Sequence, residues 1–248
     1  ETWYRPDRIV VVLAGGLQGK EGEVTQQVTE WFGDLSGQAP AEKENVEEKQ
    51  SAPHIEVVTK ADANQAHMSI GLRTFKRASE DRFAWNVFNF IMGISFSSRL
   101  FREIREKRGL CYHIRSGSDN WADVGNWSMY AGVATTKVEE ATRAIMAELA
   151  KARDEGVTDE EVAIAQKRIA TMLAFKSEDP EFLAEYYGRK EVYGEEHLTL
   201  DEYIKMIEKV TKEDINALLK KYILEHTLNM SIVWNKTSDE GLVNLLKL

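Results

Sequence analysis

The spacing of apolar residues changes within one stretch, residues 97–115, and the change predicts a helix that turns directly into a strand. Four apolar residues fall on one helical face: Phe96, Leu100, Phe101 and Ile104. Gly109 then suits the left-handed residue that ends a helix. The period next becomes two, so three residues are expected on one strand face: Leu110, Tyr112 and Ile114.

Polar residues in the same stretch support the helix. Ser97 and Ser98 precede it, and either hydroxyl can accept a bond from an early backbone N–H. Arg99 with Glu103, and Glu103 with Lys107, are one turn apart and are expected to pair on the face opposite the apolar one. From local patterns alone, this is a solvated basic helix followed by a strand with a half-buried tyrosine.

Similar patterns predict the elements on either side. Strands are expected at 54–60, 66–73, 124–134 and 228–234, and helices at 80–92, from 138, from 158, from 180, from 199 and from 211. Strands come in pairs rather than alternating singly with helices. The fold class is therefore α+β, an antiparallel sheet flanked by helices.

The chain divides into three parts by composition. Residues 1–36 contain an apolar run at 9–14, which predicts a strand, and a helical pattern that ends near Phe32. Residues 37–53 are charged and flanked by proline, as in an extended linker. Residues 54–248 form the body.

Composition limits the chemistry. The net charge of −9 argues against a general nucleic-acid surface, and no apolar run reaches the length of a membrane span. The single cysteine, Cys111, excludes an internal disulfide and a cysteine-based zinc site, and we expect it to be a small strand residue rather than a nucleophile. The sequence does not indicate in which cellular compartment the protein acts.

A zinc hydrolase needs two histidines one helical turn apart with a carboxylate beside them. No two of the five histidines lie that close: His54, His67, His113, His197 and His226. We therefore expect no metal site and no catalytic residue in this chain. The sequence does not exclude a Ser-His-Asp catalytic set, although no nucleophile elbow is present.

Residues 97–112, S-S-R-L-F-R-E-I-R-E-K-R-G-L-C-Y, closely resemble the signature of the second half-domain in the insulinase/pitrilysin family of zinc metallopeptidases, which includes the mitochondrial processing peptidase subunits. Residues 4–35 look like the closing segment of that family's first half-domain. The resemblance implies a roll-like metallopeptidase half-domain, 54–248, preceded by the closing strand and helix of a first half, 1–36, and a linker, 37–53.

The resemblance also assigns roles. Arg105 and Tyr112 match the Arg and Tyr that reach across a closed chamber to the substrate backbone, so they are the expected substrate-binding residues. Where the family's zinc motif would lie, this half carries Ala84, Val87 and Phe88, which cannot ligate zinc. Zinc, its ligands and the glutamate base are thus expected in a first half, on the same polypeptide or a partner chain.

Two functions follow from the resemblance. In one, the chain is the substrate-positioning half of a zinc-dependent peptidase that degrades or processes peptides, and is inactive alone. In the other, it is an inert partner or scaffold subunit of a peptidase-like complex. Retention of Arg105 and Tyr112 favours the peptidase.

Overall fold

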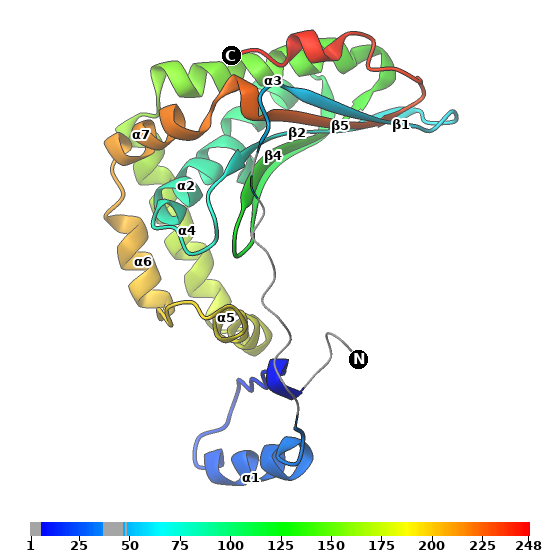
Figure 1. Cartoon of the computed structure of the whole chain (residues 1–248). Helices are drawn as coiled ribbons and strands as arrows, with labels where there is room; N and C mark the ends of the chain where they lie inside the picture. Colours follow the sequence, from blue (N-terminus) through cyan, green and yellow to red (C-terminus); the bar gives the residue numbers. More distant parts are fainter. Residues whose placement is uncertain (1–5, 37–46, 48) are drawn as a thin grey trace. The chain divides into compact units, whose positions relative to one another are not determined.

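A computed structural model describes residues 6–36, 47 and 49–248 of the chain (Figure 1). The chain forms two compact units. The sheet unit comprises residues 46–169 and 206–248, and the helical unit comprises residues 1–45 and 170–205.

The sheet unit is built on five strands in the order β1-β5-β2-β4-β3. Their bounds are β1 His54–Thr59, β2 Gln65–Thr74, β3 Cys111–Asn120, β4 Gly125–Ala134 and β5 Leu228–Trp234. The predicted α+β class is confirmed, with one difference: β1 and β5 pair in parallel, so the sheet is mixed. Because β5 returns to the sheet after a series of helices, no hairpin fixes its direction.

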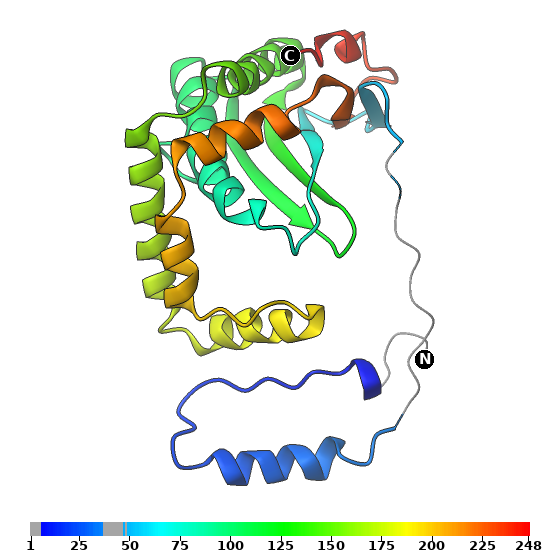
Figure 2. The ribbon, with the colours of Figure 1, turned by 60° about the vertical axis from the view of Figure 1, so that its left-hand side comes forward.

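Helices cover one face of this sheet (Figures 1 and 2). They are α2 (Asp81–Asn89), α3 (Val138–Glu155) and α7 (Lys212–Tyr222), each in contact with a strand. Alternate strand residues point into this layer and are buried: Met68, Ile70, Leu72, Trp127, Met129, Ala131, Met230, Ile232 and Trp234. This is the period-two burial that the sequence predicts.

The other helical segments that follow the linker are the π-helical turns η2 (Phe90–Ile94) and η3 (Phe101–Lys107), the helices α4 (Asp159–Lys176), α5 (Pro180–Tyr193) and α6 (Leu200–Glu208), and short 3-10 turns at Thr135–Lys137, Glu225–Thr227 and Leu242–Leu245. The expected helix starts are confirmed. At α7, for example, Thr211 Oγ1 accepts from the Asp214 N–H at 3.2 Å while Asp214 Oδ2 accepts from the Thr211 N–H at 2.9 Å.

A buried polar network ties α2 to the sheet. Asn89 Oδ1 accepts hydrogen bonds from Ser116 Oγ at 2.6 Å and from Trp127 Nε1 at 2.7 Å. Gly93 follows in η2, and a Cβ there would lie within 3.0 Å of the backbone nitrogen and Oγ of Ser116. The chain between α2 and η3 is therefore held directly against β3.

In the helical unit, the structure describes a 3-10 turn, Pro6–Arg8, and α1 (Glu21–Phe32) before the linker. The strand predicted at 9–14 is not formed in the described part of the chain, where these residues pair with no other strand, and it stays a prediction for a longer chain that supplies a neighbouring strand. A strand needs a neighbour to bond its backbone. Ile9 and Leu13 are exposed, as is Trp31 of α1.

The linker prediction falls mostly on residues 37–46 and 48, which lie outside the described residues. Its end is anchored on the sheet unit. The Gln50 side chain donates to the Leu228 carbonyl at 3.0 Å and accepts from Asn229 Nδ2 at 2.8 Å. The chain thus joins the sheet at the first residues of β5.

Candidate functional site

The candidate site lies where η3 turns into β3. Its helix begins at Ser98, whose Oγ accepts from the Phe101 N–H at 3.4 Å and whose carbonyl accepts from the Arg102 N–H at 3.0 Å. These two bonds make Ser98 the N-cap of the helix, and its side chain is buried. The Ser97 hydroxyl instead bonds that of Ser95 at 3.1 Å.

The helix ends in a widened turn. Gly109 has a φ of +61°, as predicted for the left-handed residue that closes a helix. Its N–H donates to the Arg105 carbonyl at 3.1 Å, and the Leu110 N–H donates to the Ile104 carbonyl at 3.0 Å. Each bond spans one residue more than in a Schellman motif, because η3 is π-helical rather than α-helical. Leu110 and Ile104 are both buried and fix the turn.

A β-bulge follows at once. Cys111 pairs with Val133 and His113 pairs with Gly132, so Tyr112 is the extra residue on β3. The predicted alternation is wrong at this point: Leu110 and Ile114 are buried, whereas Tyr112 is 79% exposed. A bulge inserts one residue and re-aims its side chain, and it has turned Tyr112 out of the core.

The structure brings Arg105 and Tyr112 together. Cζ of Arg105 lies 5.0 Å from the centroid of the Tyr112 ring and 4.7 Å from that of Phe101. Phe96, also 79% exposed, meets the edge of Phe101 with the centroids 5.2 Å apart. We call these four residues the junction cluster: Phe96, Phe101, Arg105 and Tyr112. The two phenylalanines were expected on the buried helical face, and the π-helical turn and the loop before it explain why they are not.

Charge at the junction cluster is uncompensated. Within the described residues, no carboxylate lies within ion-pair distance of Arg105, whereas the neighbouring Glu103 holds Lys107 at 2.7 Å and Arg108 at 3.2 Å. Burial raises the pKa of the Cys111 thiol, and the positive charge of Arg105 offsets only part of that effect. Cys111 is thus a protonated thiol at neutral pH, which is unsuited to nucleophilic attack.

Polar groups continue from the junction onto the uncovered face of the sheet. The His113 ring lies 6.0 Å from that of Tyr130, and Tyr130 Oη is 2.6 Å from Nδ1 of His67. Arg115 Cζ lies 5.8 Å from the Tyr130 ring. Sequence reasoning missed this group because three strands contribute to it, and only the strand register brings them together.

The site can donate hydrogen bonds but offers nothing to a metal. A guanidinium has five N–H donors and a phenol has one O–H donor, which suits a peptide carbonyl. Zinc does not fit this half, because the positions where the zinc motif would lie carry buried apolar side chains of α2: Ala84, Val87 and Phe88. The described residues contain no group of three or more metal-binding side chains.

None of the helices in the described part of the chain is both long and apolar enough to cross a membrane.

Comparison with known proteins agrees with the fold and the signature. The family model for the peptidase M16 inactive domain matches residues 1–169. An uncharacterized zinc protease of Mycobacterium bovis is 33% identical over 220 residues, which is 88% of this chain and 50% of that protein. The chain thus spans about half the length of the curated relatives it matches.

Two solved structures share the fold. A protease from Helicobacter pylori superposes with a TM-score of 0.79 at 18% identity, over 86% of this chain and 52% of that one. A peptidase M16 inactive domain from Pseudomonas fluorescens superposes with a TM-score of 0.75 at 19% identity, over 89% of this chain and 52% of that one. With the matched family model, these findings show that the chain belongs to the peptidase M16 (insulinase) family and carries its C-terminal, inactive domain.

Proposed function

We propose that this chain is the substrate-positioning half of a zinc-dependent peptidase, and that Arg105 and Tyr112 hold the backbone of a peptide substrate. One observation carries the proposal: the two side chains lie side by side, with Tyr112 exposed and Arg105 unpaired within the described part of the chain. A buried tyrosine and a locally paired arginine would have indicated a purely structural role.

The surrounding residues support a positioning role. Arg105 Cζ lies 4.7 Å from the Phe101 ring and 5.0 Å from the Tyr112 ring, and these two contacts restrict the guanidinium while its N–H groups stay able to donate. Donors held in place can bond a peptide carbonyl, or the oxyanion that develops from it during hydrolysis. Such bonds strengthen where water is excluded, as in a chamber closed between two halves.

The zinc ion, its ligands and the glutamate base would lie in a first half, on the same polypeptide or on a partner chain. In this arrangement residues 1–36 close the first half, 37–53 connect the halves, and 54–248 form the second. Exposed apolar residues fit this division, because Ile9, Leu13 and Trp31 would pack against the remainder of the first half.

A second candidate is an inert partner or scaffold subunit. It is favoured by the apolar residues at the zinc-motif positions of this half, which leave it without its own hydrolytic chemistry. Both candidates predict that the chain alone cleaves nothing, so the combination with a zinc-binding half separates them.

The experiment compares peptide cleavage by this chain alone and by the protein that also contains the zinc-binding half. The peptidase proposal expects cleavage only in the second case, abolished by a chelator and restored by zinc. Chelator-resistant cleavage by the chain alone would contradict both candidates. A complete, zinc-loaded assembly that cleaves no peptide would favour the scaffold.

A further inference from the structure

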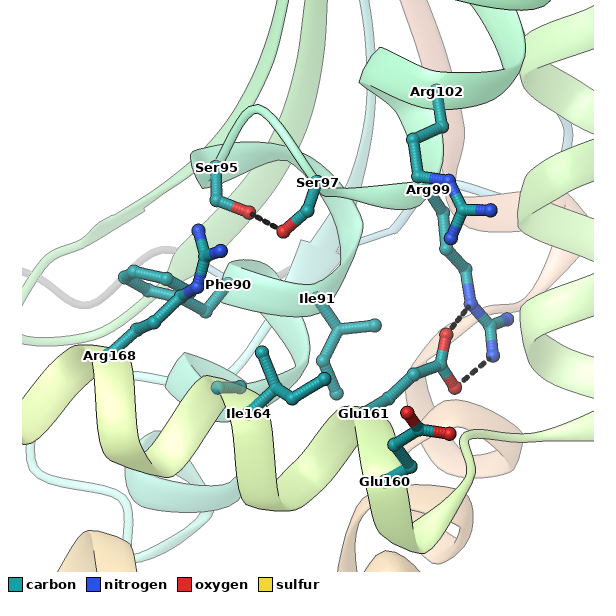
Figure 3. Close-up of a pocket in the computed structure, with 11 residues that line it drawn as sticks. Phe90, Ile91, Ser95, Ser97, Arg99, Arg102, Glu160, Glu161, Ile164 and Arg168 are labelled. Atoms are coloured by element: carbon teal, nitrogen blue, oxygen red, sulfur yellow. Dashed lines mark hydrogen bonds and ion pairs between the residues drawn. The ribbon is translucent and has the colours of Figure 1, made fainter.

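A pocket of about 220 Å³ lies in the sheet unit beside the start of the signature helix (Figure 3). Three segments form it: the π-helical turn η2, the loop before Ser98 and the first turns of η3, and the first half of α4. Its volume is below the roughly 300–1,000 Å³ of pockets that hold drug-sized ligands. A single amino-acid residue is therefore the scale of ligand that it fits.

The floor of the pocket is apolar. Phe90 and Ile91 come from η2 and Ala165 comes from α4, and all three are buried. Ile164 stands at the rim and is 46% exposed, so an aliphatic ligand would remove its surface from water. This part of the pocket favours an aliphatic group.

One carboxylate in the wall has no acceptor capacity to spare. Glu161 accepts from Arg99 Nε and Nη2, both at 2.7 Å, and from the Thr158 N–H at 2.9 Å. Arg99 also donates to the Gly156 carbonyl at 2.9 Å. The Glu161 carboxylate is thus satisfied within the fold, whereas Nη1 of Arg99 is buried and has no hydrogen-bond partner among the described residues.

The free groups of the pocket are mainly donors. Arg168 lies beside Phe90, with its guanidinium directed toward Ser95 (Figure 3). Within the described residues, neither Arg168 nor Arg102, a second lining residue, has a carboxylate within ion-pair distance. The hydroxyls of Ser95 and Ser97 bond each other, which leaves one O–H free to donate.

Acceptors are less favourably placed. The Glu160 carboxylate is exposed, and Figure 3 shows it below Glu161, on the side away from Ser95 and Arg168. A ligand beside Arg168 therefore meets a guanidinium, a hydroxyl and an aliphatic floor. A carboxylate is the group that accepts from both donors and pairs with the charge.

We propose that this pocket binds a carboxylate attached to an aliphatic body of about one residue, with Arg168 and the Ser95–Ser97 pair on the carboxylate and Ile91 and Ile164 on the aliphatic part. The ligand would be a free small carboxylate or the C-terminal residue of a peptide. This inference does not depend on the role of Arg105 and Tyr112.

The test titrates the full protein with N-acetyl-L-leucine and, as a neutral analogue of the same shape, N-acetyl-L-leucinamide. Binding is followed by NMR of isotope-labelled isoleucine methyl groups, so that Ile91 and Ile164 report the location. We expect a Kd on the order of 1 mM for the acid, from the affinity typical of so small a ligand, and at least tenfold weaker binding of the amide. A peptide ending in free leucine, compared with its C-terminal amide, distinguishes a peptide end from a free small carboxylate.

Variants assign the contact. Arg168→Ala should weaken binding of the acid about tenfold or more, since a charge-assisted bond is lost. Arg143→Ala removes the same charge from an exposed position of α3 outside the pocket, and should leave binding unchanged. Ile164→Glu places a negative charge at the rim and should abolish binding. Equal affinity for acid and amide, unshifted Ile91 and Ile164 methyls, or full binding by Arg168→Ala would overturn the proposal.

Discussion

Replacing Asn89 with leucine should destabilise the sheet unit, because the Asn89 side chain is the acceptor at the centre of a buried network. Asn89 is 6% exposed, and its Oδ1 accepts from both Ser116 Oγ and Trp127 Nε1. Leucine has a similar size and accepts no hydrogen bond. The variant therefore removes two bonds with little change in volume.

The cost follows from what each donor loses. Trp127 is fully buried, so its N–H would be left without an acceptor, which typically costs about 1–3 kcal/mol. Ser116 Oγ lies 3.4 Å from the Asn89 backbone carbonyl and can donate to it instead, so its share is smaller. We expect a loss of about 2 kcal/mol, or a fall in Tm of roughly 4–8 °C for a chain of this size.

A double-mutant cycle isolates the hydrogen bond from packing. Trp127→Phe alone loses contacts with Trp85 and Phe88, but that loss is common to both backgrounds. In the Asn89→Leu background, Trp127→Phe also removes the unpaired N–H, so it should cost about 1–2 kcal/mol less than in the wild type. Urea unfolding followed by far-UV circular dichroism measures both. Additive effects, with a coupling below about 0.5 kcal/mol, would refute the reasoning.

Gly93→Ala should lower the unfolding free energy by about 1–3 kcal/mol, because its Cβ would overlap Ser116, whereas Gly117→Ala meets no atom within 4 Å and should change it by less than about 0.5 kcal/mol; thermal unfolding measures both. Burial alone would raise the pKa of Glu161, but bonds from Arg99 and Thr158 outweigh it and hold that pKa below the ordinary 4.5. The resulting stabilisation is complete above pH 4.5 and is lost as the pH falls through the lower folded pKa. In the Glu161→Gln variant, the free energy of unfolding should therefore depend less steeply on pH below 4.5 than in the wild type. Elemental analysis of the dialysed chain should find no stoichiometric zinc, and one tightly held ion per chain would contradict the half-domain assignment.

Local patterns predicted most of the fold, because caps and periodicity are local. The Thr158–Glu161 and Thr211–Asp214 boxes start helices as expected, and β5 alternates as predicted. The strand predicted at 9–14 is absent from the described part of the chain for a related reason. Its apolar run is compatible with a strand, but strand formation needs a neighbour that local sequence cannot supply.

The candidate site was predicted only in part. The resemblance named Arg105 and Tyr112 as substrate-binding residues, which stays a prediction, whereas period-two alternation predicted a half-buried Tyr112 and the structure exposes it. The bulge that exposes it is a property of two paired strands, so one strand read alone does not reveal it. Likewise Arg99 was expected to pair with Glu103 one turn away, and it bonds Glu161 of α4 instead. Tertiary contacts overrode the helical spacing in that case.

The central claim is that Arg105 and Tyr112 bind substrate, and the most direct test is kcat/KM of Tyr112→Phe and Arg105→Ala in the protein that contains both halves. Both Tms should stay near that of the wild type, since Tyr112 is exposed and Arg105 forms no ion pair with the described residues. Loss of one donor to a developing oxyanion costs about a hundredfold or more in rate, or roughly 3 kcal/mol.

Arg108→Ala is the matched control, because Arg108 ends the same helix and pairs with Glu103 at 3.2 Å. Its kcat/KM should stay within about twofold of the wild type, the scale of a surface ion pair. We predict that Tyr112→Phe and Arg105→Ala each lower kcat/KM about a hundredfold at unchanged Tm. Wild-type kcat/KM in both variants would contradict the account.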